Sequence, residues 1–275
     1  MKDVYGNYFI QFLIKNSNQS QIDLIIEYIK EDFVTIAFDY SGTHVLQTLL
    51  DMIKTPEEEI ILLNSIKGKE LKMAFDINAT HVLQKMISII NETRRNEINI
   101  IIINNIKILS LDVNGICLVK KFIEYTYITE NKDKIIKTLT DNCIEISQSP
   151  YGNYVIQFII EEWGIIKCEP IVNIIINNIC SLSIQKYSSN VIEKIIDLLD
   201  FKKLNLLIHE LFFSNTFINI LKSKYGKYVI QKAIKSLNNN QKVEIYNYLN
   251  DLKFDPQYGK YKMKIKNILG YFDNE

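Results

Sequence analysis

The 275-residue sequence has few residues that interrupt helices, with nine glycines and four prolines. This scarcity disfavours a turn-rich β fold and favours helices. The four cysteines, at 117, 143, 168 and 180, never fall in the CxxC-type spacing of a zinc site. We therefore expect reduced thiols, as in a cytosolic or nuclear protein. Residues 1–14 are polar at intervals, so no signal peptide is evident.

Net charge is also absent, because 32 lysines and arginines balance 32 aspartates and glutamates. A nonspecific nucleic-acid binder usually carries a basic excess, so any nucleic-acid role must rest on a local surface. The most apolar stretch, 98–111, contains three asparagines and a lysine and is too short and too polar to span a bilayer. No phosphate loop, nucleophile–base pair or pocket-forming carboxylate pair is found. We expect a protein that is not an enzyme, uses no cofactor and contacts no membrane.

One unit is repeated along nearly the whole chain. Seven segments align without gaps, at steps of 36, 37, 36, 37, 36 and 38 residues. They are DVYGNYFIQ, DYSGTHVLQ, DINATHVLQ, DVNGICLVK, SPYGNYVIQ, QKYSSNVIE and SKYGKYVIQ, which begin at Asp3, Asp39, Asp76, Asp112, Ser149, Gln185 and Ser223. Five of the eleven glutamines occupy the last position of this unit, and five of the nine glycines occupy the fourth. A fixed period of this kind indicates a repeat protein whose neighbouring units share a core.

Each unit is predicted to form a helical hairpin. Its first residue is polar and can cap a helix, and its fourth residue is always small, which allows close packing at the helix start. Two apolar residues, such as Val45 and Leu46, begin three positions after the small residue and are expected to point inward. Amphipathic stretches at 22–29, 57–66 and 96–106 show the three- and four-residue spacing of a second helix.

The repeats predict a single domain over 1–275, because no linker or shift of composition interrupts them. A weaker copy of the unit starts at Gln257, and we interpret 257–275 as a C-terminal capping half-repeat. No first helix precedes Asp3, so the first repeat is expected to begin at its second helix and to leave Phe9 and Leu13 uncovered.

Three positions in each unit are polar or variable, and we call them the reading triplet. If the residue after the small one is position i, the triplet is i, i+1 and i+4. On a helix, i and i+4 lie one turn apart on one face, with i+1 at its edge. The triplets are Asn7, Tyr8, Gln11; Thr43, His44, Gln47; Thr80, His81, Gln84; Ile116, Cys117, Lys120; Asn153, Tyr154, Gln157; Ser189, Asn190, Glu193; and Lys227, Tyr228, Gln231.

The chemistry of the triplets suits unpaired bases. Position i+1 is Tyr or His in five of seven units, and a ring can stack on a base face with roughly 1–3 kcal/mol per base. An amide at i+4 offers a donor and an acceptor to a Watson–Crick edge. The carboxylate of Glu193 only accepts, which suits the N1–H and N2–H groups of guanine.

NYxxQ, SNxxE and small-xxxQ, on the second helix of a repeat of this length, resemble the Pumilio (PUF) repeat across nearly the whole chain. PUF repeats read one base per helical repeat with two or three side chains. The resemblance implies an all-α, right-handed superhelical solenoid of about seven repeats that binds single-stranded RNA as a monomer. It also implies a cytoplasmic regulator of mRNA 3′ untranslated regions that recruits deadenylase or repression machinery.

The resemblance further implies a base for each repeat. Asn with Gln reads uracil, Ser with Glu reads guanine, and a small residue with Gln reads adenine, although threonine here replaces the more usual Cys or Ser. Stacking is implied for Tyr8, His44, His81, Tyr154, Asn190 and Tyr228. Because RNA runs antiparallel to the protein in this family, the expected site is 5′-(U)GUNAAU-3′. Its first base falls to Lys227 and Gln231, where lysine replaces the expected Asn.

Some residues leave alternatives open. Ile116, Cys117 and Lys120 offer neither an amide nor a ring, so the fourth repeat could flip its base out, tolerate any base, or contact phosphate through Lys120. Four lysines directly follow position i+4 and either meet the phosphate backbone or are solvated: Lys85, Lys121, Lys194 and Lys232.

Three other functions are compatible with parts of the sequence. A PUF-like ribosome-assembly factor in the nucleolus would bind structured RNA with less sequence choice, but such proteins usually lose the triplet code. A HEAT- or armadillo-like scaffold would bind a protein segment and would not need Gln at every i+4. His44 and His81 could ligate a metal, but no third ligand is evident, so no metal site is expected.

Overall fold

The structure is a computed structural model that describes residues 1–251, with side chains described up to residue 248. The described chain consists of helices joined by short turns, and no strand occurs within 1–251. The predicted all-α class is therefore confirmed. Residue contacts divide the chain into two compact units, 1–141 and 142–275, and each is described by itself. The single domain stays a prediction, and the cap at 257–275 lies outside the described residues.

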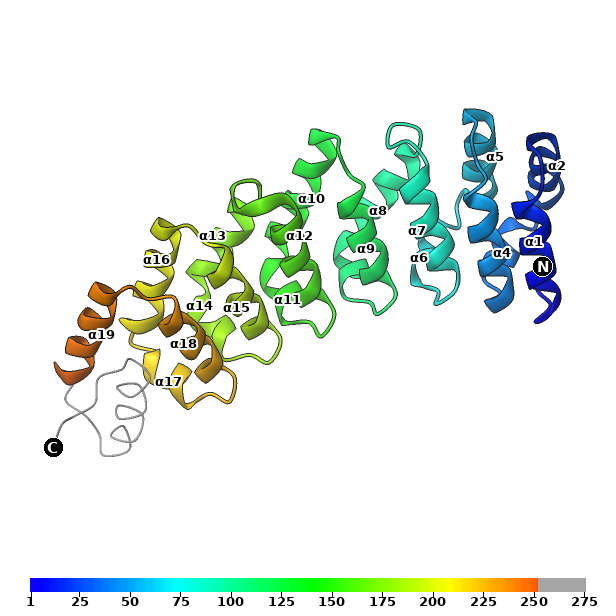
Figure 1. Ribbon diagram of the computed structural model, residues 1–275. Coiled ribbons are helices and arrows are strands. Elements are labelled where there is room, and N and C mark those ends of the chain that lie inside the picture. Colours follow the sequence, from blue (N-terminus) through cyan, green and yellow to red (C-terminus); the bar gives the residue numbers. More distant parts are fainter. Residues whose placement is uncertain (252–275) are drawn as a thin grey trace. The chain divides into compact units, whose positions relative to one another are not determined.

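The first unit contains the reading helices of repeats 1–4, which are α1, α4, α7 and α9 (Figure 1). Each of these helices packs on the next, and α2 packs on α5 and α8 on α10 in a second layer. The helices are α1 (Gly6–Lys15), α2 (Gln19–Ile29), α3 (Phe33–Ala37), α4 (Tyr40–Leu50), α5 (Pro56–Ile66), α6 (Glu70–Phe75), α7 (Ala79–Ile89), α8 (Asn96–Ser110), α9 (Gly115–Glu124) and α10 (Thr129–Asp141).

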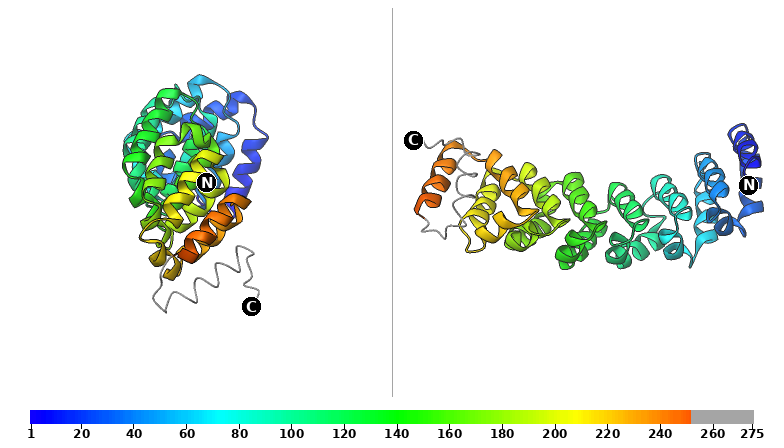
Figure 2. Two further views of the ribbon diagram at one scale, coloured as in Figure 1. Left: turned by 90° about the vertical axis from the view of Figure 1, so that its left-hand side faces the viewer. Right: turned by 90° about the horizontal axis from the view of Figure 1, so that it is seen from below.

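The second unit contains the reading helices of repeats 5–7, which are α12, α15 and α18. They also pack in chain order, α12 on α15 and α15 on α18, and α13 packs on α16 in the second layer. Within each unit, Figures 1 and 2 show successive reading helices side by side. The helices are α11 (Cys143–Gln148), α12 (Gly152–Lys167), α13 (Glu169–Asn177), α14 (Ile179–Ser183), α15 (Ser188–Leu198), α16 (Phe201–Phe212), α17 (Phe217–Lys222), α18 (Gly226–Lys235) and α19 (Asn239–Asp251).

The predicted two-helix hairpin is incomplete, because a short helix precedes most reading helices. The short helices are α3, α6, α11, α14 and α17. Gly68, with a φ of 76°, lies in the turn that separates α5 from α6. Repeat 4 differs because α8 runs through this region as one helix of 15 residues. A short helix therefore lies directly under the start of the reading helix in the other complete repeats.

The start of each reading helix explains the polar first residue and the small fourth residue of the unit. Asp39 caps α4 by accepting from the backbone N–H groups of Ser41 (2.9 Å) and Gly42 (2.8 Å). A Cβ on Gly42 would collide with the carbonyl oxygen of Ile36 in α3. The same capping contact is made by Asp3, Asp76, Asp112, Ser149 and Ser223. Close packing of the short helix on the reading helix therefore demands a small residue.

The paired apolar positions form the core of each unit, as predicted. Val45 and Leu46 are fully buried, and the equivalent pairs from repeat 2 to repeat 7 are buried as well. Repeat 1 is the exception to this burial, because Phe9 is 62% exposed on α1, as expected for this residue. Leu13, which was expected to lack cover, is 43% exposed on the same helix.

Candidate nucleic-acid interface

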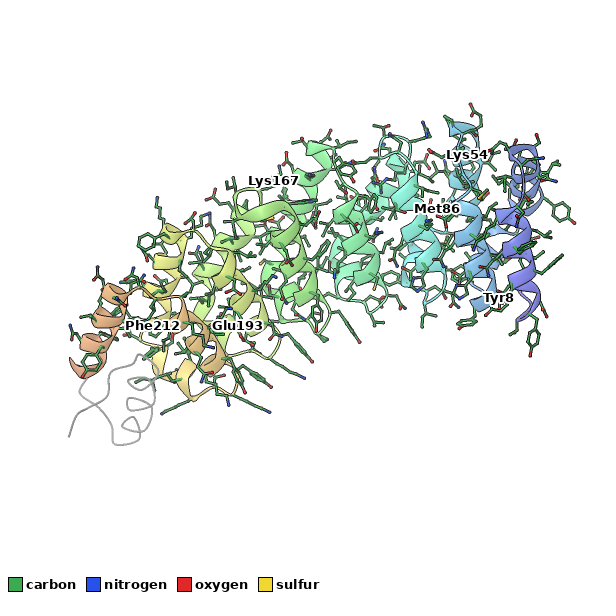
Figure 3. All side chains as sticks on the ribbon, viewed as in Figure 1. Tyr8, Lys54, Met86, Lys167, Glu193 and Phe212 are labelled. Atoms are coloured by element: carbon green, nitrogen blue, oxygen red, sulfur yellow. The ribbon has the colours of Figure 1, made fainter. Side chains whose placement is uncertain are left out.

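The reading helices share one pattern of burial. Positions i+2 and i+3 enter the core in repeats 2–7, whereas position i+4 is half-buried and position i+1 is exposed in all seven repeats. The exposed fraction is 71% for Tyr8, 52% for Tyr154 and 51% for Tyr228. Figure 3 labels Tyr8 on α1 and Glu193 on α15. Each reading helix therefore presents one exposed side chain beside one half-buried polar side chain, which is the arrangement that a stacked base requires.

Position i is more enclosed than the sequence pattern suggests. Asn7, Thr43, Thr80, Asn153 and Ser189 are buried, whereas Ile116 and Lys227 are half-buried. The side chain at position i therefore turns back onto the first turn of its helix or onto the next repeat. Any contact of position i with a ligand must therefore use polar atoms that form no hydrogen bond within the protein.

The Asn–Gln repeats share one hydrogen-bond network. The Nδ2 atom of Asn153 donates to the carbonyl oxygens of Ser149 (2.9 Å) and Pro150 (3.1 Å). Gln157 Nε2 then donates to Asn153 Oδ1 over 3.0 Å. Asn7 and Gln11 repeat these contacts on α1. The network holds the glutamine amide and leaves Gln157 Oε1 as an open acceptor, which suits the N3–H group of uracil.

The Thr–Gln repeats differ because the threonine hydroxyl is used inside the protein. Thr43 Oγ1 donates to the carbonyl oxygen of Asn78 in the next repeat over 3.0 Å. Gln47 Nε2 lies 3.4 Å from Thr43 Oγ1, and Gln84 lies at the same distance from Thr80 Oγ1. Glutamine is therefore the principal polar group that these two repeats can offer to a base.

Glu193, like Gln231 in repeat 7, has no hydrogen-bond partner within the described residues. Ser189 Oγ instead donates to the carbonyl oxygen of Lys186 (3.2 Å). Burial raises the pKa of Glu193, the nearby Lys232 ammonium opposes that rise, and the Asp197 carboxylate adds to it. The Glu193 side chain is thus half-buried, and its two carboxylate oxygens are available to accept hydrogen bonds from a ligand with two adjacent N–H donors.

The fourth reading helix lacks these groups. Ile116 and Lys120 are half-buried on α9, and the exposed position i+1 is Cys117. Neither an amide acceptor nor an aromatic ring is available there. The structure thus agrees with a repeat that does not read a base edge, and the three alternatives for this repeat remain open.

The lysines after position i+4 connect neighbouring repeats. Lys194 pairs with Glu161 at 2.9 Å, and Lys232 pairs with Asp197 at 2.6 Å. Lys85 pairs with Asp51 in the same register, i+5 on one repeat with i+8 on the repeat before. Lys121 pairs with Glu124 on its own helix. Neither phosphate contact nor solvation, the two alternatives for these lysines, includes the ion pairs. The aligned sequence contains their signal, because the repeat before each of the three lysines has an acidic residue at i+8.

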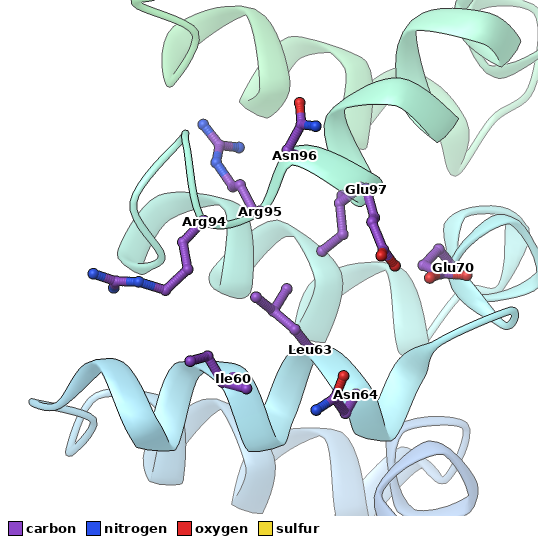
Figure 4. A pocket seen from close by; sticks show the side chains of 9 residues that line it. Ile60, Leu63, Asn64, Glu70, Arg94, Arg95, Asn96 and Glu97 are labelled. Atoms are coloured by element: carbon purple, nitrogen blue, oxygen red, sulfur yellow. The ribbon is translucent and has the colours of Figure 1, made fainter.

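The pockets found in the first unit lie away from the triplets. One of about 350 Å³ lies between α5, α6 and α8 and is lined by Leu63, Glu70 and Arg95 among others (Figure 4). Figure 4 shows the neighbouring Arg94 and Arg95 side chains extending in different directions. Arg94 pairs with Glu59, and Glu97 pairs with Lys67. Arg94 and Glu97 are thus paired within the protein, and the triplets remain the candidate interface.

Two further searches cover residues 1–251. No group of three or more His, Cys, Asp or Glu side chains in this range could hold a metal ion, and His44 and His81 have no third ligand there. Over the same range, every helix is too short or too polar to cross a membrane.

A family model for the Pumilio-family RNA binding repeat matches residues 1–30, 32–66, 71–98, 142–176, 178–212 and 217–249. The chain belongs to the Pumilio family. These segments include six of the seven triplets and omit 99–141, which contains Ile116, Cys117 and Lys120. Membership confirms the predicted family and rejects the HEAT- or armadillo-like alternative. It also confirms that the chain is not an enzyme, because Pumilio repeats are RNA-binding modules.

Relatives and solved structures agree with this assignment. Pumilio homolog 12 of Arabidopsis thaliana is 29% identical over 246 residues, which cover 87% of this chain and 41% of that protein. A Pumilio domain-containing protein of Schizosaccharomyces pombe is 26% identical over 245 residues, covering 89% and 36%. The chain thus spans about two fifths of the length of these curated relatives.

Among solved structures, the Puf4 RNA binding domain bound to the HO endonuclease RNA 3′ UTR recognition sequence matches with a TM-score of 0.86. It is 27% identical, and the match covers 99% of this chain and 86% of that one. PUF-8 in complex with PBE-RNA matches with a TM-score of 0.82 and 25% identity, covering 97% and 80%. The Pumilio-type repeat fold is thus shown independently of the triplets.

Proposed function

We propose that this Pumilio protein binds single-stranded RNA in a sequence-specific manner, with one base per repeat, at sites of the form 5′-(U)GUNAAU-3′. The observation that carries the proposal is the recurrence of one exposed i+1 side chain and one half-buried i+4 polar side chain on every reading helix except α9, which lacks the polar amide or carboxylate. Stacking on a ring is sequence-tolerant, so base choice falls to positions i and i+4.

The open atoms support the base proposed for each repeat. Asn153 and Asn7 each hold a glutamine, which suits uracil, although Gln11 Oε1 also accepts from Thr48 Oγ1 (3.2 Å) while Gln157 Oε1 stays open. Glu193 has two open acceptors, which suit guanine. The threonines leave glutamine as the main polar group, which is compatible with adenine. The fourth repeat supplies no base-edge pair, so its position is written N. Lys227 at the seventh repeat makes the first uracil the weakest part of the site.

We further propose that the RNA targets are 3′ untranslated regions and that the protein acts as a cytoplasmic, monomeric repressor with deadenylase or repression machinery as its partner. The support is the likeness to Puf4, whose solved complexes contain 3′ UTR recognition sequences, and the family resemblance of the triplets. The retained triplet code favours this role over a nucleolar assembly factor for structured RNA.

The deciding experiment is a selection of random single-stranded RNAs on the purified chain, followed by sequencing. A UGU core followed, after one unselected position, by two adenines is the expected result. A control protein with Gln157→Ala and Glu193→Ala should lose enrichment at the U and G that those residues read, and keep it elsewhere. Folded protein that enriches no motif would overturn the proposed function.

A further inference from the structure

The loops that lead into the reading helices change charge along the chain. Four positions before i, repeats 1–4 carry an aspartate, whereas repeats 5–7 carry a neutral residue at the same position: Ser149, Gln185 and Ser223. In the last two repeats these loops also gain lysines. We call Lys186, Lys222 and Lys224 the basic edge, and all three are exposed.

The two loops of the basic edge lie next to each other. Ser223 Oγ donates to the carbonyl oxygen of Ile184 over 3.4 Å, and α15 packs on α18 just beyond. The lysines of both loops therefore face solvent at the same end of two adjacent reading helices. An edge of this kind presents several like charges within a short span, which requires counter-ions or an anionic partner.

No acidic side chain of the described residues pairs with the basic edge, which distinguishes it from the paired lysines of this unit. Within the described residues, Lys186, Lys222 and Lys224 form no ion pair, whereas Lys194 and Lys232 on the same two helices are both paired. The first unit shows the opposite charge at this end of its helices, because Asp39 and its equivalents cap them there.

Aromatic rings accompany the lysines. Lys186 Nζ lies 4.9 Å from the ring centroid of Tyr187, and Lys224 Nζ lies 5.9 Å from that of Tyr225. Both rings are half-buried, as expected for residues that pack at a helix start. Lys227, at position i of repeat 7, lies 4.9 Å from the ring of Tyr228 and so joins the edge to the last triplet. Ammonium groups interleaved with rings are the chemistry of a single-stranded nucleic-acid groove.

We infer that the basic edge binds the phosphates of RNA nucleotides that lie 5′ of the read site. This inference rests on the proposed function, because repeat 7 takes the 5′ end only if RNA runs antiparallel to the chain. The caps of repeats 1–4 are negative, so the 3′ flank meets no equivalent surface. The flanking contact adds affinity without base choice, since phosphates carry no sequence information.

The test compares three RNAs: the read site alone, the site with four extra uridines at its 5′ end, and the site with four at its 3′ end. The wild-type chain should bind the 5′-extended RNA more tightly than the other two. In the variant Lys186→Gln with Lys224→Gln, this gain should disappear. The slope of log K against log salt on the 5′-extended RNA should fall by roughly 0.7 for each lost phosphate contact.

The matched control is Lys202→Gln with Lys235→Gln, which removes the same charge from exposed sites on α16 and at the far end of α18. Its salt slope and its gain from the 5′ extension should equal those of the wild type. Equal binding of all three RNAs by the wild type would overturn the inference and leave the proposed function intact. The same conclusion would follow if both double variants lost the gain from the 5′ extension equally. Failure to bind even the read site would overturn both.

Discussion

At the scale of single residues, the proposed base choice rests on the polar atoms that form no hydrogen bond within the protein. Asn153 donates through Nδ2 to two backbone carbonyls and accepts from Gln157 through Oδ1, so the pair has a defined orientation in the absence of RNA. Ser189 bonds to its own first turn and leaves Glu193 without a partner in the described structure. Repeats 5 and 6 thus differ in which acceptor atoms are free to contact a base. Exchanging the residues at i and i+4 should therefore exchange this property.

Exchanging Ser189→Asn and Glu193→Gln should convert the guanine preference of repeat 6 into a uracil preference. An asparagine at 189 can donate to the carbonyls of its first turn as Asn153 does, and it then holds the new glutamine. The discrimination between G and U at this position should change by about 1–3 kcal/mol, the value of one good base-edge pair. Fluorescence anisotropy with the G and U forms of one RNA measures it.

The reciprocal variant, Asn153→Ser with Gln157→Glu, is the control for this exchange. It should move repeat 5 from uracil toward guanine and leave repeat 6 unchanged. Continued selection of G by the first variant would show that base choice does not reside in the residues at i and i+4.

Binding of guanine should weaken as the pH is lowered from neutral. The charged form of Glu193 accepts from guanine, so protonation competes with the base. Burial raises the pKa of Glu193, so this loss begins at a higher pH than for an ordinary glutamate; Lys232 opposes the shift and Asp197 adds to it. The pH dependence of Kd for the G-containing RNA measures the effect. In the Glu193→Gln variant that dependence should be flat, and a parallel fall in both proteins would place the titrating group elsewhere.

The sequence predicts the identity of the triplets, since their period is visible in the chain, but not the state of each side chain. Burial of Thr43 and its bond to Asn78 depend on how closely one repeat packs on the next. The pair between Lys232 and Asp197 could have been inferred, because i+5 and i+8 are aligned positions of adjacent repeats. The carboxylate at position 193 is visible in the sequence. The rise in its pKa could not be predicted, because it results from burial in the folded chain.

At the scale of helices, the tight contact between each short helix and the following reading helix determines which residues are tolerated. A Cβ on Gly42 would collide with the carbonyl oxygen of Ile36, whereas a Cβ on Gly6 would meet only the side chain of Asp3, at 3.1 Å. A Cβ would collide with the preceding helix at Gly115, Gly152 and Gly226 as well, so a residue larger than glycine is costly where that helix packs this closely and is tolerated at Gly6, where no described helix precedes.

The substitution Gly42→Ala should lower the free energy of unfolding by about 1–3 kcal/mol, the usual cost of forcing an extra methyl into a packed site. Urea unfolding followed by circular dichroism measures the change as a shift of the midpoint. Gly6→Ala, at the equivalent position of repeat 1, is the control and should change stability by less than about 0.5 kcal/mol. Equal effects of the two substitutions would show that the short helix is not the cause.

Helix positions were largely predictable from the period, but the contacts that close the turns between helices were not. Arg95 is 1% exposed and donates through Nη2 to the carbonyl oxygen of Tyr125, and burial lowers its pKa to about 10. Nearby, Glu92 accepts from the backbone N–H of Tyr127 (2.6 Å) and from Asn131 Nδ2 (2.8 Å). No repeat-wide pattern marks Arg95, so its role depends on local three-dimensional packing alone.

At the scale of the whole molecule, the triplets are divided between two compact units, with those of repeats 1–4 in the first and those of repeats 5–7 in the second. The fourth triplet, the last of the first unit, is the one without a base-edge pair, and the family model also omits its surroundings. The RNA position opposite it is therefore the point at which the read site should best accept a change of length.

One extra nucleotide inserted at the N position of 5′-(U)GUNAAU-3′ should weaken binding by less than about tenfold, or about 1.4 kcal/mol. The inserted base adds to a position that is not read, and the bases on either side keep their repeats. An insertion between G and the following U should cost more, because at least one base must leave its ring and its amide, and each stacked base contributes roughly 1–3 kcal/mol. Competition binding against the uninterrupted site measures both costs. If the two insertions weaken binding equally, the fourth repeat holds its base as firmly as its neighbours do, and its Ile116, Cys117 and Lys120 would have to contact RNA in a way that the other triplets do not.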